Sequence, residues 1–469
     1  MKGLIWLRSD LRIDDNPALD MANIECTQIA CVYLLSEKEW ETHNNANVKL
    51  DFIVRNLFEL SKDLRKLNIP LLSASVESFN EVPNQIAKIC KSNNISKCYW
   101  NNEFGVDEQA RDKNVKSILK GIKVDYESFH EQTLFEPGTL LTAQGKPFSV
   151  FTPFKKKWIE NFSHDHLDIE SNFSAKKPFD IVDPINHELK FHKTHNVDMS
   201  LWPAGEVAAN NRLQSFLEKK VFNYSKDRND PIIDGTSRLS PYLALGVISN
   251  RRCVLEALML NNFELQAGNK GICKWIDEII WREFYKNIMY SFPRVSMNKP
   301  FNLSTQSIKW RHNEEDINAW KNGKTGFPLI DAAMQQLKYE GWMHNRLRMV
   351  VAMFFTKNLL LDWRIGEAFF MKNLIDGDFA SNNGGWQWSA STGTDAAPYF
   401  RIFNPVTQSQ NFDSEGRFIK KYLPQLASLN DKEIHLPSPE HLYKIDYPSQ
   451  IVDLKSSRLR AIEVFKANK

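Results

Sequence analysis

Apolar and polar positions alternate in two rhythms along the first 130 residues. Short runs of aliphatic, β-branched and aromatic residues have the length of buried strands, and the stretches between them repeat apolar residues every three or four positions, as an amphipathic helix does. This alternation is typical of a parallel sheet covered by helices on both faces. The clearest helix is predicted over Val48–Leu67. The predicted strands are Gly3–Leu7, Ile29–Leu35, Pro70–Val76, Lys97–Trp100 and Val124–Phe129.

The rhythm stops near residue 131. Turn-forming prolines and glycines follow, and polar residues and histidines without a clear period fill Ser163–Ser200. We expect this part to be a long connector that runs over the surface. A run of three lysines, Lys155–Lys157, is interpreted as a solvated helix start in preference to a DNA contact.

From Glu206 onward the periodicity is that of helices, and it closes with a basic helix over Ile451–Ala467. The sequence therefore predicts an N-terminal α/β domain with a five-stranded, parallel, doubly wound sheet over residues 1–130. A connector over 131–200 and an all-α domain over 201–469 follow. The other predicted helices are Glu206–Lys219, Pro241–Val247, Ser249–Leu260, Lys274–Tyr290, Glu314–Asn322, Phe327–Tyr339, Trp342–Asn358 and Gly366–Lys372.

Composition restricts the class of protein without defining the activity. The chain has 469 residues, 42% of them hydrophobic, which is enough for two or three domains. Its six cysteines form no CxxC pair and join no histidine cluster, so we expect reduced thiols and no metal site. No signal peptide and no run near the roughly 20 apolar residues of a membrane span are visible, so a cytoplasmic protein of bacterial type is expected. A net charge of +3 does not by itself predict nucleic-acid binding.

The stretch Leu374–Asn404 combines residue types that are seldom neighbours. It holds two aspartates, two adjacent asparagines, a glycine pair and two tryptophans. Tryptophan is costly to expose, and amides and carboxylates must be hydrogen-bonded when buried. The mixture suits the wall of a cavity that holds a flat aromatic ligand with polar edges. A turn-rich link between two core helices explains the composition equally well.

Two other stretches place polar and aromatic residues on one predicted helical face. In the first, Trp275, Glu278 and Arg282 share a face, although a core tryptophan pair beside a solvated ion pair is the simpler interpretation. The second is a stripe of residues at i, i+3, i+4 and i+7. It is less easily interpreted as part of an apolar core, because its asparagine and arginine need hydrogen-bond partners when buried. This stripe consists of Trp342, Asn345, Arg346 and Met349.

A third stretch, Thr236–Pro241, gathers hydroxyl groups at a predicted helix start. Free backbone N–H groups and side-chain hydroxyls at such a position can bind a phosphate. An ordinary helix N-cap has the same composition, and on the residues alone it is the preferred interpretation.

These stretches resemble the DNA photolyase/cryptochrome family. DGDFASNNGGWQW and, after Ser389, ASTGTDAAPYFRIFNP are similar to the flavin-pocket motif of that family. LIWLRSDLRIDDNPAL is similar to its first strand and loop, DGTSRLSPYLALG to its flavin-diphosphate loop, and WREFY to a helix of its lesion pocket. The resemblance covers nearly the whole chain, is densest from Tyr224 to Pro424, and is strongest to class I cyclobutane pyrimidine dimer photolyases.

By this resemblance, the helical domain binds FAD, which is active in its reduced form. Asp376 and Asp378 would contact the ribose and the ring edge, and Asn382 would face the reactive ring nitrogen. The flavin-binding residues that the resemblance implies are Tyr224, Thr236, Ser237, Arg238, Leu239, Ser240, Trp275, Glu278, Arg282, Asn345, Arg348, Asp376, Gly377, Asp378 and Asn382.

The resemblance also implies a pocket for a flipped-out lesion of ultraviolet-damaged DNA. Trp281 would pack against the flipped bases, and Glu278 would hydrogen-bond or protonate the pyrimidine. Glu278, Asn345 and Asn382 form the expected catalytic set. Relatives that repair the (6-4) photoproduct have histidines in place of Asn345 and Met349, so the cyclobutane dimer is the expected substrate. The implied lesion and DNA contacts are Arg228, Glu278, Trp281, Trp342, Asn345, Arg346, Met349, Arg401 and Gln408.

Two further functions follow from the same resemblance. Trp386, Trp363 and Trp310 match the electron-hopping chain that carries electrons from the surface to photo-oxidised flavin. Asp107 and Glu108 match contacts of a folate antenna, so a second chromophore is expected and 5,10-methenyltetrahydrofolate is favoured over a deazaflavin. Because Ser296 and Met297 replace a cysteine and a lysine of folate-binding relatives, a deazaflavin or no antenna stays open.

The expected activity is light-driven repair of cyclobutane pyrimidine dimers in DNA, by electron transfer from excited reduced FAD to the flipped-out lesion. A cryptochrome-type blue-light photoreceptor is the alternative, and Asn382 argues against it because plant cryptochromes tend to have aspartate there and animal ones cysteine. A flavin oxidoreductase would need a nicotinamide site, and no glycine-rich fingerprint follows the first strand. A purely structural DNA-binding protein would not need the Asp–Asn–Trp wall. We expect a monomer that binds damaged DNA and no membrane.

Overall fold

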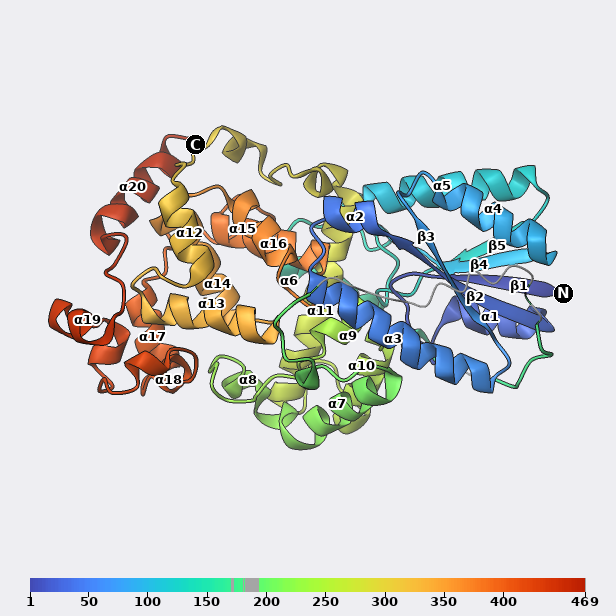
Figure 1. The fold of residues 1–469 in the computed structure, drawn as a ribbon, viewed down its shortest axis with the longest axis horizontal. Helices are drawn as coiled ribbons and strands as arrows, with labels where there is room; N and C mark the ends of the chain where they lie inside the picture. Colours follow the sequence, from blue (N-terminus) through green and yellow to red (C-terminus); the bar gives the residue numbers. More distant parts are fainter. Residues whose placement is uncertain (170–172, 180, 182–193, 469) are drawn as a thin grey trace.

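The structure is a computed structural model that describes residues 1–169, 173–179, 181 and 194–468. An α/β part, blue and cyan in Figure 1, lies beside a larger helical part. Its five strands are all parallel, in the order β3-β2-β1-β4-β5, which confirms the predicted fold class. The strands are β1 (Lys2–Leu7), β2 (Gln28–Ser36), β3 (Leu71–Val76), β4 (Lys97–Asn101) and β5 (Asp125–Phe129), and the helices of this part are α1 (Pro17–Glu25), α2 (Glu37–Thr42), α3 (Asn47–Lys66), α4 (Val82–Asn93) and α5 (Val106–Gly121).

The sheet separates two apolar cores because successive side chains of a strand point to opposite faces. On β1, Ile5 and Leu7 belong to the core that also holds residues of α1 and α3. Leu4 and Trp6 belong to the core that holds residues of α4 and α5. The chain leaves β1 toward the helical part, where Leu11 N–H donates to Leu245 O at 3.1 Å. The carboxyl ends of the strands, where parallel α/β sheets usually bind ligands, therefore face the junction of the two parts.

One helix of the connector, α6 (Phe151–Asn161), packs against the helical part. It begins four residues before the lysine run, so the run is not a helix start as predicted. Lys155 is held in an ion pair with Asp277, 2.5 Å away, whereas Lys156 is largely exposed. Part of the predicted connector, residues 170–172, 180 and 182–193, lies outside the described residues.

The helical part agrees with most of the predicted helices within a few residues. Among the differences, α9 is shorter than predicted and ends at Ala244, and Leu374–Asn404 contains a helix, α16, that was not predicted. The helices are α7 (Glu206–Lys219), α8 (Tyr224–Asp227), α9 (Ser240–Ala244), α10 (Asn250–Leu260), α11 (Lys270–Ser291), α12 (Glu314–Asn322), α13 (Pro328–Glu340), α14 (Asn345–Met353), α15 (Trp363–Met371), α16 (Phe379–Ala390), α17 (Pro405–Phe412), α18 (Arg417–Tyr422), α19 (Pro439–Ile445) and α20 (Leu454–Lys466).

The predicted helix Trp342–Asn358 is divided differently. Its α-helical part, α14, begins at Asn345 because the His344 side chain accepts the Arg346 N–H and caps the first turn. It ends in a π-helical turn over Phe354–Asn358. The predicted stripe is therefore wrong in one member, because Trp342 lies outside the helix, three residues before its first residue.

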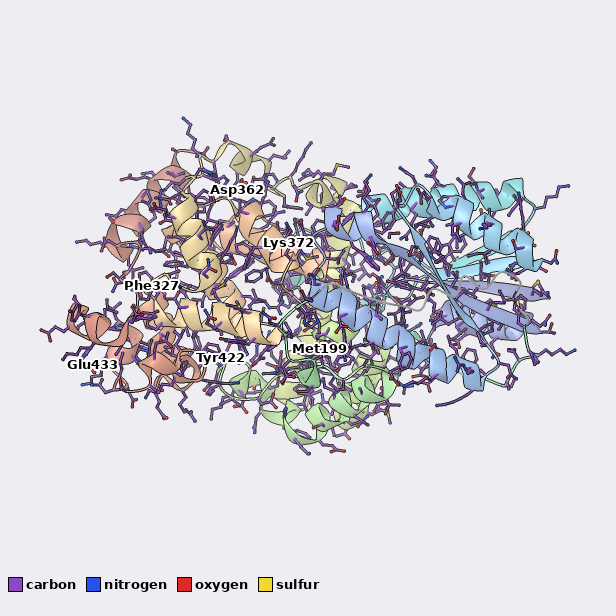
Figure 2. All side chains as sticks on the ribbon, viewed as in Figure 1. Met199, Phe327, Asp362, Lys372, Tyr422 and Glu433 are labelled. Carbon is purple, nitrogen blue, oxygen red and sulfur yellow. The ribbon has the colours of Figure 1, made fainter. Side chains whose placement is uncertain are left out.

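Close packing of α11, α15 and α16 forms the centre of the helical part. In Figure 2, Asp362 and Lys372 mark the two ends of α15, which lies beside α16. Gly384 lets α16 approach α11, because a Cβ there would come within 2.2 Å of the Tyr285 ring. Among the described residues, no helix has the length and apolar character needed to cross a bilayer, and no cluster of acidic, histidine and cysteine side chains is placed to hold a metal ion.

Candidate functional site

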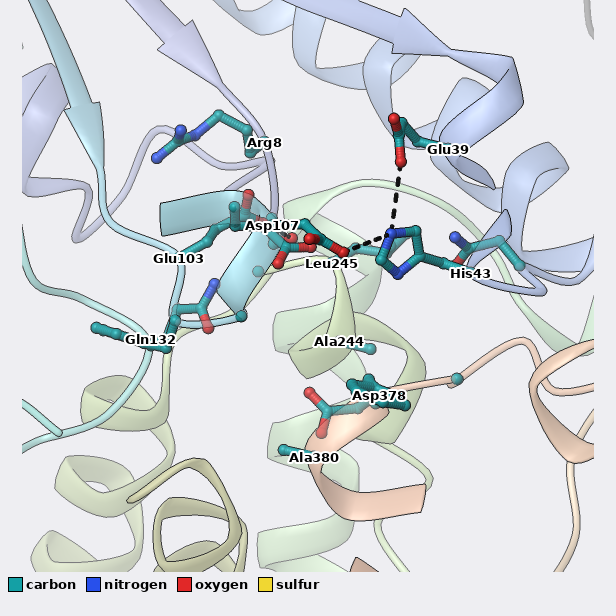
Figure 3. A pocket seen from close by; sticks show the side chains of 18 of the residues that line it. Arg8, Glu39, His43, Glu103, Asp107, Gln132, Ala244, Leu245, Asp378 and Ala380 are labelled. Atoms are coloured by element: carbon teal, nitrogen blue, oxygen red, sulfur yellow. Dashed lines mark hydrogen bonds and ion pairs between the residues drawn. The ribbon is translucent and has the colours of Figure 1, made fainter. Parts of the chain in front are cut away.

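A cavity of about 450 Å³ lies at the junction of the two parts (Figure 3). The α/β part supplies its wall from the loop after β1, the start of α3, and the segment that joins β4 to α5. The helical part supplies the link from α9 to α10, the middle of α11, and the start of α16. Of the predicted flavin residues, Arg282, Gly377 and Asp378 line this cavity, and the rest are not among the described residues of its wall.

Asp378 is the central anion of this wall. It caps α16 by accepting the Ser381 N–H at 2.9 Å, and its other oxygen lies 3.3 Å from Lys286 Nζ. Burial alone would raise the pKa of Asp378, but Lys286 and Arg282 outweigh it and hold that pKa well below its usual range. Lys49 reaches across from α3 and donates to Gly377 O at 2.8 Å. This part of the wall therefore holds the Asp378 carboxylate between the Lys286 and Arg282 cations, with Lys49 close by.

Asp376 and Arg348 form a second pair beside it. The Arg348 guanidinium lies 2.8 Å from one Asp376 oxygen and 3.0 Å from the other, and it also donates to Met343 O. Asp376 is 5% exposed. The pair joins the start of α14 to the segment before α16, so the two predicted flavin contacts hold each other in place.

Asn382 has a partner that the sequence did not suggest. Its amide donates to Glu367 Oε1 at 2.9 Å and to the Glu367 carbonyl at 3.1 Å. Glu367 lies on α15, is 4% exposed and lines the cavity. Burial raises the pKa of Glu367 to about 7, partly offset by the hydrogen bond from Asn382. The Glu367 carboxyl group therefore fixes the orientation of the Asn382 amide. With a pKa of about 7, the same carboxyl group gains or loses its proton near neutral pH.

Glu367→Gln is expected to flatten part of the pH dependence of stability. The folded-state pKa of about 7 lies above the ordinary value of 4.5 for a glutamate, so the contribution of Glu367 to stability is full below pH 4.5 and is lost as the pH rises through 7. A shift of this size corresponds to roughly 3 kcal/mol. The difference in unfolding free energy between variant and wild type, measured by urea denaturation, should therefore change in favour of the variant from pH 5 to pH 8.

The exposed Glu415→Gln variant is the control, and its difference from wild type should stay constant over the same range. An equally constant difference for Glu367→Gln would show that Glu367 keeps one protonation state throughout.

The predicted diphosphate loop, Thr236–Ser240, touches the segment before α14. Arg238 pairs with Glu340 at 3.2 Å, and its guanidinium lies 4.7 Å from the centre of the Trp342 ring. The Trp342 indole N–H donates to Ser240 Oγ at 3.2 Å. Arg238 has a φ of 50°, a left-handed conformation that a long side chain adopts at a cost. The loop and a predicted lesion residue are therefore fixed together.

Tyr224 and Trp275 meet around one ring. Tyr224 starts α8 and Trp275 lies on α11, and both pack on Phe216 of α7, with ring centres 5.7 and 5.0 Å away. Both are less than 10% exposed. The structure thus brings these two predicted residues together from separate elements, although it places them in a core rather than on the wall of the 450 Å³ cavity.

Glu278 lies among cations on α11. Arg228 forms a short ion pair with Glu278, and Lys274 Nζ lies 3.4 Å from the same oxygen. Two of the predicted DNA-side residues are therefore in contact, and Lys274 is an addition that the sequence did not single out. Trp281, less than one turn further along α11, is half-buried and stacks on Phe151.

The start of α14 presents the other predicted lesion residues. Asn345 is its first residue and is exposed, and Met349 is half-buried one turn later. Arg346 donates to Asn229 at 2.6 Å and lies 4.5 Å from the centre of the Phe412 ring. Burial, followed by the charge of Arg228, lowers the pKa of Arg346, which is the direction expected where cations gather without enough anions.

Arg346→Ala is expected to weaken DNA binding and its dependence on salt. If the guanidinium binds one phosphate, the slope of log affinity against log salt should fall by about one. Binding of a fluorescent duplex, measured from 50 to 300 mM salt, provides the slope. Arg364→Ala, which removes an arginine paired with Asp362 on α15, should leave the slope unchanged. An unchanged slope in Arg346→Ala would make Arg346 a structural residue.

The remaining DNA-side predictions fall near α17. Arg401 is exposed in the segment before this helix, and Gln408 lies within it. The buried Oε1 of Gln408 has no hydrogen-bond partner among the described residues. The structure neither pairs these two residues with the lesion residues nor excludes a DNA contact, so their roles stay predictions.

The three predicted hopping tryptophans lie in or against one core. Trp363 and Trp386 are 1% and 2% exposed, and Trp310 is half-buried beside them. A backbone bridge between Arg311 and Leu361 brings the segments of Trp310 and Trp363 together. Three described rings pack against Trp386, those of Phe355, Phe370 and Trp320, and the tryptophan among them is Trp320, with ring centres 5.9 Å apart. Trp320 was not predicted, and it offers a second tryptophan next to Trp386.

At the opposite side of the cavity, Asp107 and Glu108 occupy the first turn of α5. His43 lies between two carboxylates, with its Nε2 3.6 Å from Asp107 and 3.5 Å from Glu39, as Figure 3 shows. Burial raises the pKa of Glu108. Ser296 and Met297 line the same cavity, so the predicted antenna residues and part of the predicted flavin wall share one space.

Several lining residues escaped the sequence analysis for a common reason. Lys49, His43 and Glu367 belong to no local motif, because Lys49 meets Gly377, His43 meets Asp107 and Glu367 meets Asn382 from a separate element. Lys286 could have been found, since it lies one helical turn after Arg282.

The described residues fit a bound dinucleotide such as FAD. A cavity of this volume is within the usual range for cofactor sites. Arg282, Lys286 and Lys49 can balance phosphate or enolate charge, and Asp378 can accept from hydroxyl groups. The fold and the site together define a class of protein in which an α/β part and a helical part meet at a polar cavity of cofactor size.

Comparison with known proteins identifies this class. Residues 3–172 match the family described as DNA photolyase, and residues 275–467 match the FAD binding domain of DNA photolyase. The deoxyribodipyrimidine photo-lyase of Vibrio cholerae is 37% identical over 468 residues, with 99% of both chains covered. That of Escherichia coli is also 37% identical, covering 99% of this chain and 98% of that protein.

Solved structures give the same result. A bacterial class III photolyase from Agrobacterium tumefaciens superposes with a TM-score of 0.87 at 32% identity, over 100% of this chain and 97% of that one. A cryptochrome from Synechocystis superposes with a TM-score of 0.85 at 27% identity, over 99% of both chains. The chain belongs to the DNA photolyase family.

Proposed function

We propose that the protein is a deoxyribodipyrimidine photo-lyase that repairs cyclobutane pyrimidine dimers in DNA with light. The observation that carries this proposal is similarity to photo-lyases of this name over 99% of the chain, at 37% identity. FAD, when bound in reduced form and excited by light, supplies the electron that splits the dimer.

The cofactor would be held from two sides. Asp378, fixed by Lys286, and the Asp376–Arg348 pair present oriented acceptors and donors on the helical side. Lys49 closes the site from the α/β side through its bond to Gly377 O. Asn382, oriented by Glu367, would face the flavin ring. Because these groups are already paired with one another, little ordering is needed when the cofactor binds.

The DNA lesion would enter beside α11 and α14. Arg228, Arg346 and Arg401 would bind phosphates, and the damaged step would leave the stack at low cost because it stacks poorly. Trp281 and Trp342 would contact the bases, and Met349 would line the same pocket. Glu278, balanced by Arg228 and Lys274, would hold the pyrimidine by a hydrogen bond. The chain has Asn345 and Met349 where relatives that repair the (6-4) photoproduct have histidines. This difference supports the cyclobutane dimer as the substrate and class I as the type of photo-lyase.

An antenna chromophore is the second part of the cofactor proposal. The space beside Asp107, Glu108 and His43 is continuous with the cavity, and 5,10-methenyltetrahydrofolate is favoured over a deazaflavin on the match of the two acidic residues. Ser296 and Met297 weaken the match. A solved relative from Sulfolobus tokodaii carries two FAD molecules, so a second flavin is a third possibility for this space.

The domain division at residues 130 and 200, a monomeric state and a cytoplasmic location belong to the same proposal.

The deciding experiment is repair of a thymine-dimer oligonucleotide by purified, reduced protein under blue light and in darkness. Loss of dimers only in the light is the expected result. Bound flavin without repair in either condition would reject a photo-lyase and favour a cryptochrome-type photoreceptor, the alternative that similarity to the Synechocystis cryptochrome keeps open.

A further inference from the structure

The connector helix α6 holds α11 at two points one turn apart. The Phe151 ring lies on the Trp281 indole with ring centres 3.7 Å apart and planes 8° from parallel. One turn later, Lys155 Nζ lies 2.5 Å from Asp277 Oδ1. Since Asp277 and Trp281 are also one turn apart, the two helices match residue for residue along this contact.

The end of α6 that carries Phe151 is itself anchored. The Phe151 N–H donates to Asp395 Oδ2 at 3.2 Å, and Thr394 Oγ1 donates to Ser149 O at 2.6 Å. Thr394 and Asp395 follow α16, the helix that carries Asn382. The negative charge of Asp395 also lies at the positive end of α6. Phe151 is therefore tied to the segment that forms the flavin wall.

The stack covers one face of the Trp281 indole, and Phe284 and Tyr285 of α11 pack against the same indole at steeper angles, with ring centres 5.7 and 5.6 Å away. Phe151 is 7% exposed, so its ring is part of the core, whereas Trp281 remains half-buried. A planar indole covered on one side can accept another flat ring only on the opposite side. Contact with Phe151 also limits rotation of the indole about its side-chain bonds, because any large turn would drive it into the neighbouring ring.

We propose that Phe151 is a positioning residue that fixes the plane of Trp281 as the stacking platform for a flipped-out pyrimidine of the DNA lesion. This inference rests on the proposed function. An indole that is already fixed loses little conformational entropy when the flipped base binds. A mobile indole would lose that entropy on binding, so the stack with Phe151 strengthens binding of the base. The stack acts on the lesion alone, so binding of undamaged DNA does not depend on it.

The test compares dark binding of a thymine-dimer oligonucleotide with binding of the undamaged oligonucleotide. Phe151→Leu removes the flat ring and should lower the ratio of the two affinities by roughly three- to tenfold, a range typical of aromatic pairing energies. Affinity for undamaged DNA and the FAD content should stay within twofold of wild type. Phe151→Tyr retains the ring and should restore the ratio. Repair at saturating substrate should be nearly unchanged, so the effect should appear in KM rather than kcat.

Phe162→Leu is the matched control. Phe162 also stacks on a tryptophan, Trp158, with ring centres 5.4 Å apart and planes 13° from parallel, whereas the described rings that pack on Trp281 are Phe151, Phe284 and Tyr285. Its removal should leave the affinity ratio unchanged. If Phe151→Leu loses flavin, Phe151→Met provides a second variant of similar volume without a flat ring.

An unchanged ratio in a folded, flavin-bound Phe151→Leu or Phe151→Met protein would overturn the inference while leaving the proposed function intact. An equal fall in Phe162→Leu would also overturn it, because the effect would then be a general loss of packing. A wild-type protein with no preference for the dimer would overturn the proposed function, and the inference with it.

Discussion

Asp378→Asn is expected to strip most of the FAD from the protein. The substitution removes the buried carboxylate that faces Lys286 and Arg282, and it leaves their charges without compensation. Breaking a buried pair by removing one partner typically costs about 3 kcal/mol or more. We therefore expect flavin content after purification to fall at least roughly tenfold, which corresponds to about 1.4 kcal/mol in binding. Absorbance at 450 nm relative to protein, together with the thermal midpoint, would measure both effects.

Asp331→Asn is the matched control for this prediction. Asp331 is also a fully buried carboxylate of the helical part, but its hydrogen-bond partners among the described residues are Thr325, Gly326 and Tyr447, none of which is a cation. This variant should be destabilised while the folded fraction keeps its flavin. If Asp378→Asn retained full flavin content and the wild-type midpoint, the carboxylate would not be part of the cofactor site.

Trp386→Phe is expected to abolish most photoreduction of oxidised flavin while sparing repair by protein that is already reduced. The indole of Trp386 is easier to oxidise than a benzene ring, so the substitution raises the barrier of the first electron step. A fall of more than roughly tenfold in rate corresponds to about 1.4 kcal/mol. Stability should change by only about 1 kcal/mol, because the indole nitrogen has no hydrogen-bond partner among the described residues. Flavin absorbance under blue light with an external reductant would measure the rate.

Two companion variants locate the next step of the route. Trp363 belongs to the predicted chain, whereas Trp320 is the tryptophan whose ring touches Trp386. Slow photoreduction in Trp363→Phe with a normal rate in Trp320→Phe would support the predicted order. The reverse result would move the route to Trp320. A normal rate of photoreduction in Trp386→Phe would show that Trp386 does not take part in electron transfer to the flavin.

Local pattern was enough for the sheet and for most helices. Strands and amphipathic helices show their period within a single segment, so the five strands and helices such as Glu314–Asn322 were predicted within a few residues. Pattern failed for α16, which is buried on most of its circumference and shows no apolar face. It also failed at Trp342, because the His344 side chain caps the first turn of α14, which begins at Asn345, three residues after Trp342.

The site divides in the same way. The types of residue in Leu374–Asn404, read together with the family resemblance, were sufficient to predict a flavin wall. The partners of those residues were not predictable, because each is contributed by a different element. Lys49 meets Gly377 across 328 residues, and Phe151 meets Trp281 from a connector that had been interpreted as surface.

The sequence by itself determined the order of strands and helices, the family, and the residue types of the cofactor wall, because all three are properties of neighbouring positions. Only the tertiary structure decided which side chains face one another. It paired Asn382 with Glu367, balanced Asp378 with Lys286, and placed Phe151 on Trp281. The physical reason is that these contacts depend on how closely whole helices approach, which glycines such as Gly384 permit and which no local period of the chain records.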